Sequence, residues 1–166
     1  MLKPNAQFNK ITDISADFLK KNNIKGLILD LDNTLIDTKH NFLEGAEEWI
    51  AEMKSAKIKI CIATNSIKKE KTQKLADIID VPYVSLSLKP LKRGVKKAIK
   101  ILELNNEEIA EIGDQLFTDV WVSNRMKFYS ILTKPISADR FKIDKIKRKI
   151  EKWYLMRIKT KEQEEV

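Results

Sequence analysis

The chain has 166 residues, of which 43% are hydrophobic and 34% charged, and its formal net charge is +8. This size and composition suit one soluble globular domain that needs no disulfide or structural metal. A single cysteine and a single histidine exclude a structural zinc site, which requires four such ligands. The first residues lack a signal-peptide pattern, and no apolar stretch approaches the ~20 residues of a membrane span. We therefore expect a cytoplasmic protein with anionic partners: phosphorylated substrates, anionic lipid or nucleic acid.

Short apolar runs alternate with amphipathic stretches along the chain. The pattern predicts, in order, a strand at 27–31, helix at 44–55, strand at 58–63, helix at 67–79, strand at 83–86, helix at 92–104, strand at 109–112, helix at 116–126, strand at 128–132 and helix at 139–158. This alternation indicates α/β architecture with a three-layer, Rossmann-like, doubly wound parallel sheet. We expect residues 1–166 to form a single domain that ends in a short tail at 160–166. Ligands of such sheets bind beyond the carboxyl ends of the strands.

Polar residues follow the first predicted strand, where Asp30 and Asp32 stand in the sequence Asp-Leu-Asp-Asn-Thr. Residues two apart on a strand point to the same side, so the two carboxylates are expected to converge. With Asp114 from a neighbouring strand they would offer Mg²⁺ the oxygen ligands that it prefers. A carboxylate can also attack phosphorus, while its partner acts as acid and base. The alternative is a turn or helix cap, which Asp-Asn-Thr also favours.

Three further polar clusters follow the next strands. Thr64 or Ser66 can bind a phosphoryl group, although Thr-Asn-Ser is equally good as a helix cap. Lys89 can neutralise a transferring phosphoryl group, with Lys92 or Arg93 as substitutes and a solvated surface lysine as the alternative. Gly113 permits a sharp turn before Asp114, the third expected metal ligand. Asp119 is expected to orient Lys89 or a metal-bound water, unless this segment is a capping loop.

These four clusters, in this order, resemble the haloacid dehalogenase (HAD) superfamily of phosphohydrolases. Residues 30–34 match its DxDx[TV] motif, and residues 113–119 match the GDxxxTD form of its last motif. The resemblance implies a Mg²⁺-dependent phosphatase with Asp30 as nucleophile and Asp32 as acid and base. It also implies a metal held by Asp30, Asp114 and the backbone carbonyl of Asp32. Its further implications are phosphate binding by Thr64, Asn65 and Lys89, and support of the reacting groups by Asp119 and Thr34.

More narrowly, the segments at 24–35, 89–94 and 113–120 are similar to the YqeG-like group of subclass IIIA. That group is related to phosphatases that remove the terminal phosphate of phosphatidylglycerophosphate, so a lipid phosphate is the expected substrate. A nucleic-acid end phosphatase, a small-metabolite phosphatase and a binding module without turnover are the alternatives. Between Asp32 and Thr64 lie 31 residues, and between Thr64 and Lys89 lie 24, which leaves no room for a cap domain. An open site would suit a bulky substrate.

The last predicted helix is strongly basic, because residues 139–159 contain nine Lys and Arg and three Asp and Glu, a net charge of +6. Its apolar residues form a helical stripe: Ile143, Ile146, Ile150, Trp153 and Tyr154. Such a helix suits an anionic membrane surface. Packing of the stripe against the sheet is the favoured prediction for residues 143–150, and both arrangements stay open for residues 153–158.

Overall fold

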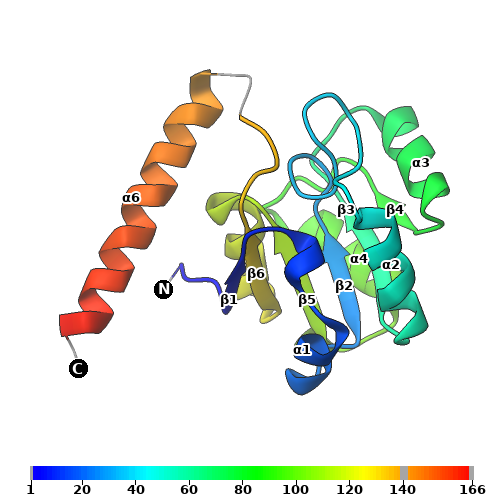
Figure 1. Cartoon of the computed structure of the whole chain (residues 1–166), viewed down its shortest axis with the longest axis horizontal. Coiled ribbons are helices and arrows are strands. Elements are labelled where there is room, and N and C mark those ends of the chain that lie inside the picture. The colour runs from blue at the N-terminus through cyan, green and yellow to red at the C-terminus, as the bar shows by residue number, and fades with distance from the viewer. Residues whose placement is uncertain (1, 139–141, 165–166) are drawn as a thin grey trace.

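The computed structural model describes residues 2–138 and 142–164, and in the last helix it describes the side chains of residues 145–157. Six parallel strands form one sheet in the order β1-β6-β5-β2-β3-β4 (Figure 1). The strands are β1 (Ala6–Phe8), β2 (Gly26–Leu29), β3 (Lys59–Ala63), β4 (Tyr83–Val84), β5 (Ile109–Gly113) and β6 (Tyr129–Thr133). The helices are η1 (Ile11–Asp13), α1 (Ala16–Lys21), α2 (Ala46–Ser55), α3 (Lys69–Ile78), α4 (Lys92–Leu102), η2 (Asn106–Glu108), η3 (Leu116–Val120), α5 (Trp121–Met126) and α6 (Lys142–Glu164). The expected doubly wound parallel sheet is confirmed.

Two apolar layers cover the sheet, because successive strand residues face opposite sides. On one face, Leu27 and Leu29 pack with buried residues of α2 and α3, among them Trp49 and Ile50. On the other face, Ile28 packs with residues of α4 and α5. Cys61 lies in this second layer as a buried free cysteine. Burial of both faces explains why the strand sequences are almost continuously apolar.

The first 21 residues contain elements that the sequence pattern did not predict, namely β1, η1 and α1. Strand β1 pairs with β6 at the edge of the sheet, and it is only three residues long. So short a segment shows no period, which is why hydrophobic patterning misses it. Helix α6 also differs from the prediction, since it extends to Glu164 and includes residues 160–164 of the expected tail.

Helix α6 lies beside the β1 edge of the sheet (Figure 1). Tyr154 and Leu155 pack against a small buried cluster of Leu116, Val120 and Leu132. Ile146, Ile150 and Trp153 are about half exposed instead. The prediction that the stripe packs on the sheet is therefore wrong for Ile146 and Ile150, and the side chain of Ile143 lies outside the described residues. Hydrophobic periodicity revealed the stripe without revealing which way it faces.

Candidate active site

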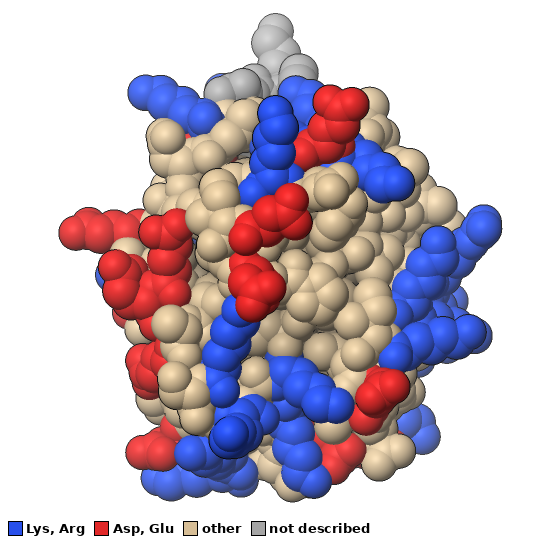
Figure 2. Space-filling view, turned by 90° about the vertical axis from the view of Figure 1, so that its right-hand side faces the viewer, with Lys and Arg blue, Asp and Glu red and all other residues tan. Residues whose placement is uncertain are grey.

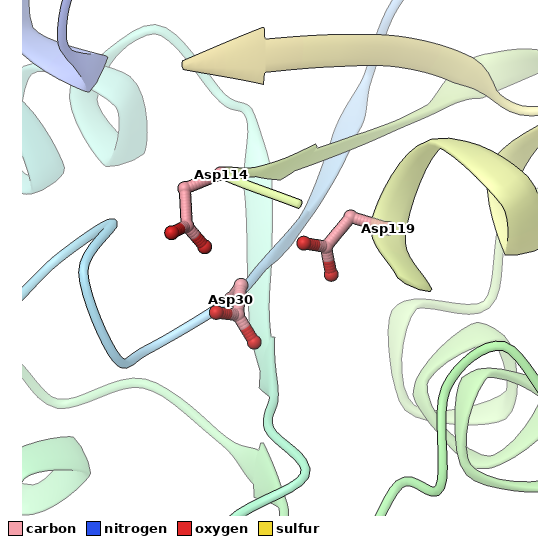
Figure 3. A group of neighbouring side chains, drawn as sticks. All are labelled: Asp30, Asp114 and Asp119. Carbon is pink, nitrogen blue, oxygen red and sulfur yellow. The ribbon is translucent and has the colours of Figure 1, made fainter. Parts of the chain in front are cut away.

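Three aspartates converge at the carboxyl ends of the central strands. Asp30 follows β2, Asp114 follows β5 and Asp119 lies in η3, and one carboxylate oxygen from each lies within 4.8 Å of the other two (Figure 3). All three are buried. Buried carboxylates are costly unless they are paired or bind a cation, so this cluster requires positive charge nearby.

Lys89 supplies one such charge from the loop after β4. Its Nζ lies 2.9 Å from Asp30 Oδ1, 2.5 Å from Asp119 Oδ1 and 3.5 Å from Glu111 Oε1. Among the described side chains, Lys89 rather than Lys92 or Arg93 makes these contacts. The expected pairing of Lys89 with Asp119 is present in this geometry. Glu111 was not predicted, although a glutamate within an otherwise apolar strand is a signal that could have been recognised.

Burial and repulsion from neighbouring carboxylates raise the pKa values of Asp30, Glu111 and Asp114. Burial raises the pKa of Asp30 to about 7 against the opposing effect of Lys89, and it raises the pKa of Glu111 to about 8. Burial also raises the pKa of Asp114, although the charge of Arg148 opposes the shift. Burial alone would lower the pKa of Lys89, but Asp119, Asp30 and Glu111 together raise it well above its ordinary value. The cluster therefore contains more carboxyl groups than its lysine can keep ionised.

Asn65 holds the loop that carries Lys89. Its side-chain oxygen accepts hydrogen bonds from the Lys89 backbone N–H at 2.7 Å and from the Ser87 hydroxyl at 2.8 Å. Its amide nitrogen donates to the Lys89 carbonyl at 2.9 Å. The side chain was expected to bind phosphate, but these three bonds engage both ends of its amide. The structure therefore gives the Asn65 side chain a positioning role.

Two glycines allow close backbone packing beside the site. Gly94 lets the loop that carries Lys89 approach α4, and Gly113 lets η3 approach the end of β5. A β-carbon on Gly113 would lie 2.2 Å from Asp119 Cγ, and a β-carbon on Gly94 would lie 2.2 Å from Ser87 Cα. Both distances are far below van der Waals contact. The sequence suggested that Gly113 permits a sharp turn, whereas its φ lies outside the left-handed region. Gly113 is required because Asp119 occupies the space that a side chain would need.

Asp32 does not join the buried cluster. Strand β2 ends at Leu29, so Asp30 and Asp32 lie beyond it and the alternation of strand side chains does not apply. The Asp32 side chain is 50% exposed, and its Oδ1 lies 3.2 Å from Lys71 Nζ on α3. The expected convergence of its carboxylate with Asp30 and Asp114 is therefore wrong, and Asp119 is the third carboxylate of the cluster. A metal contact of the Asp32 backbone carbonyl stays a prediction. An exposed carboxylate at the entrance can still exchange protons with a leaving group.

Thr34 and Thr64, the two threonines expected in the site, are buried. The Thr64 hydroxyl accepts a hydrogen bond from the Ser66 backbone N–H at 3.1 Å, and its own hydrogen can be donated elsewhere. Thr34 Oγ1 has no hydrogen-bond partner among the described residues. Its expected supporting role therefore has no visible contact. Thr64 keeps a donor at the end of β3, the strand next to β2.

Arg148 reaches the cluster from α6, and sequence reasoning missed it because hydrophobic periodicity does not show which partner a charged residue of the helix meets. Its guanidinium forms an ion pair with Asp114 Oδ2 and donates to the Asp114 carbonyl. Glu151, one turn later, accepts from the Phe117 backbone N–H at 3.2 Å. Two residues of the basic helix are thus part of the site.

The donor set fits a divalent cation. Ionised Asp30, Glu111, Asp114 and Asp119 exceed Lys89 and Arg148 by two negative charges. Asp114 Oδ1 is buried without a hydrogen-bond partner among the described residues, which leaves one lone-pair donor unused. Carboxylate oxygens are hard ligands of the kind that Mg²⁺ prefers. Asp30, Asp114 and Asp119 are the residues that would hold or surround such an ion.

Comparisons with known proteins identify a family of phosphatases. Residues 1–137 match the model of the family described as "Mitochondrial PGP phosphatase". The protein called "Probable phosphatase YqeG" from Bacillus subtilis (strain 168) is 32% identical over 159 residues, covering 95% of this chain and 92% of that protein.

Solved structures share the fold. The 3-deoxy-D-manno-octulosonate 8-phosphate phosphatase from Yersinia pestis aligns with a TM-score of 0.54 at 16% identity, covering 74% of this chain and 79% of that chain. The cobalt-bound YrbI phosphatase from Haemophilus influenzae aligns with a TM-score of 0.53 at 16% identity, covering 70% of this chain and 81% of that chain. The chain belongs to the PGP phosphatase family and is a phosphatase of the HAD superfamily.

Proposed function

We propose that this protein is a Mg²⁺-dependent phosphomonoesterase that works through an aspartyl-phosphate on Asp30. The observation that carries the proposal is the convergence of Asp30, Asp114 and Asp119 within 4.8 Å, with Lys89 bonded to two of them. Bound Mg²⁺ would supply positive charge that attracts the substrate phosphoryl oxygens and offsets their repulsion from the Asp30 carboxylate. Lys89 and Thr64 would bind the same oxygens.

The covalent step transfers the phosphoryl group from the substrate oxygen to Asp30. One Asp30 oxygen forms the new bond to phosphorus as the bond to the leaving oxygen breaks, and Asp32 gives that oxygen a proton. Asp32 then takes a proton from water, whose oxygen attacks the same phosphorus. The acyl phosphate breaks at its phosphorus–oxygen bond, which releases inorganic phosphate and restores the Asp30 carboxylate.

We propose phosphatidylglycerophosphate as the substrate, with its terminal phosphomonoester as the reacting group. The name of the matched family supports this choice. The described residues 30–45, between β2 and α2, form a loop with isolated bridges and no added domain. An entrance without a cap leaves room for a large lipid headgroup. A phosphorylated nucleic-acid end or a small phosphorylated metabolite could react by the same steps, and these remain the alternative substrates.

We further propose that the enzyme acts in the cytoplasm and attaches to the inner face of an anionic membrane through the outer side of α6. No described helix has the length and apolar character to cross a membrane. The outer side exposes Ile146, Ile150 and Trp153, and Arg157 stacks over the Trp153 ring at 5.1 Å. Exposed Lys145 and Lys149 flank them. Apolar side chains beside cations suit an anionic lipid surface.

The opposite side of the molecule has a different charge pattern. Figure 2 shows this side, which carries α3, with acidic side chains gathered along one margin and basic side chains along the other and below. Among the described side chains 145–157 of α6, Glu151 is the only acid, and it points inward to Phe117. The contrast favours α6 as the membrane-facing element.

The deciding experiment measures phosphate release from phosphatidylglycerophosphate in mixed micelles, beside a soluble phosphate ester and a 3′-phosphorylated oligonucleotide. We expect strong preference for the lipid, loss of all turnover in EDTA and recovery with Mg²⁺. Mg²⁺ should also raise the melting temperature of the wild-type protein and not that of Asp114→Asn. Equal rates on all three substrates would refute the lipid assignment. Turnover in the presence of chelator would refute the proposed Mg²⁺ dependence.

A further inference from the structure

A cavity of about 750 Å³ opens beside the catalytic cluster, between α6 and the strands β1 and β6. Asp114 and Arg148 line it, so it adjoins the cluster that holds Asp30 and Lys89. Its volume lies in the range of sites that take small molecules. None of the steps proposed above uses this space.

The lining combines apolar and cationic groups. Phe8, Leu132, Leu155 and Met156 supply apolar surface. Lys134 and Lys152 join Arg148 as the cations of the lining, and both lysines are exposed at its rim. All three acids of the lining have partners, because Asp114 pairs with Arg148, Glu151 accepts from the Phe117 N–H and Asp13 accepts from the Lys10 N–H. A ligand that presents an anion next to an apolar group would match this surface.

We propose that this cavity binds the phosphatidyl part of the substrate: the internal phosphodiester against Arg148, Lys134 and Lys152, and the first carbons of the acyl chains against the apolar walls. The inference rests on the proposed lipid substrate and names the residues that would distinguish it from other phosphate esters. In such a lipid, one glycerol unit separates the reacting phosphate from the phosphodiester. The shared residue Asp114 places the cavity next to the reacting group, as that connection requires.

The test uses short-chain phosphatidylglycerol, which stays monomeric and carries the phosphatidyl part without the reacting phosphate. Its dissociation constant is measured by titration calorimetry on the full-length protein, so membrane attachment does not contribute. We expect Met156→Trp, which places a larger side chain at the cavity wall, and Lys152→Glu, which reverses a charge there, to weaken binding roughly tenfold or more each. Met156 is 52% exposed, so the larger side chain does not disturb the core.

Two matched variants serve as controls. Ile78→Trp on α3 enlarges another exposed apolar residue, and Lys97→Glu on α4 makes the same charge reversal on an exposed lysine. Neither residue lines the cavity. Both variants are expected to bind the short-chain lipid as the wild type does. Equal affinities in all five proteins, or no stronger binding of the lipid than of glycerol phosphate, would overturn the inference.

Hydrolysis of a soluble phosphate ester with Mg²⁺ keeps the two proposals separate. If the wild-type enzyme hydrolyses the ester while the lipid fails to bind, the cavity assignment is wrong and the chemistry stands. If the lipid binds and the two cavity variants weaken it while no phosphate ester is hydrolysed, the cavity assignment stands and the proposed reaction falls.

Discussion

Two regions of this molecule are rich in charge and hold it in opposite ways. At the ends of β2 and β5, Lys89 is buried against three carboxylates, each within 3.5 Å of its Nζ. On the outer side of α6, Lys145 and Lys149 are exposed beside half-exposed apolar residues. Buried charges interact strongly with one another, whereas solvent and salt screen exposed ones. The same residue type can therefore stabilise a reacting centre or a reversible contact with a surface.

Asp30→Asn should have the largest effect, on the buried side of this comparison. The amide is a poor nucleophile toward phosphorus, so phosphate release should fall by roughly a thousandfold or more. The fold should persist, because Lys89 keeps Asp119 and Glu111 as partners. Phosphate release and the circular dichroism spectrum provide the two readouts. Full activity, once deamidation has been excluded by mass spectrometry, would refute the covalent mechanism.

Lys89→Met compared with Lys71→Met tests burial directly. The first change leaves three carboxylates without their cation, which should cost about 3–5 kcal/mol of unfolding free energy. The second removes an ion pair to the half-exposed Asp32, which is worth roughly 1 kcal/mol or less. Urea unfolding of both variants gives the two values. Similar losses would show that burial does not distinguish these lysines.

Glu111→Gln should change how stability depends on pH. The pKa of Glu111 is about 8 in the folded protein against an ordinary value of 4.5, so its carboxyl holds a proton more tightly when folded. Its contribution to stability is complete below pH 4.5 and is lost as pH rises to about 8. The unfolding free energy of the wild type should fall relative to that of the variant across this window and then level off.

A matched glutamate provides the control for that experiment. Glu108 is only partly buried and its pKa is lowered by its hydrogen bond from Lys25, so its contribution is lost only as pH falls below its ordinary range. The unfolding free energy of the wild type relative to that of Glu108→Gln should therefore stay constant between pH 4.5 and 8. An equal fall of the wild type relative to both variants would mean that burial of Glu111 is not the cause.

Lys149→Gln should have the smallest effect, on the exposed side of the comparison. Removing one cation near an anionic bilayer costs about 1 kcal/mol, or roughly a fivefold weaker partition to the vesicles. Sedimentation with phosphatidylglycerol-containing vesicles measures this change, with Lys97→Gln on α4 as the control. Identical partition of the two variants would place the membrane contact elsewhere.

The two regions also differ in how far the sequence predicted them. Asp30, Asp114 and Lys89 follow apolar strands, and strand order alone brings such positions together. The orientation of Asp32 was mispredicted because β2 ends at Leu29, three residues before Asp32, so the alternation of strand side chains does not reach it. Arg148 was missed because helical periodicity describes a stripe and not the neighbour of each residue. Its contact with Asp114 depends on tertiary packing 34 residues away along the chain.

The two glycines beside the site have a consequence for how this sequence can vary. Neither takes part in any step of the reaction, yet the absence of side chains at 94 and 113 allows the Lys89 loop and the Asp119 carboxylate to occupy their positions. At Gly94 the obstacle is the backbone of Ser87, which cannot rotate aside as a side chain can. Even one added methyl group at either position would displace a loop or a carboxylate of the reacting centre. The shape of this active site is therefore set in part by volume that the sequence leaves empty, at positions where alanine would be the mildest possible change.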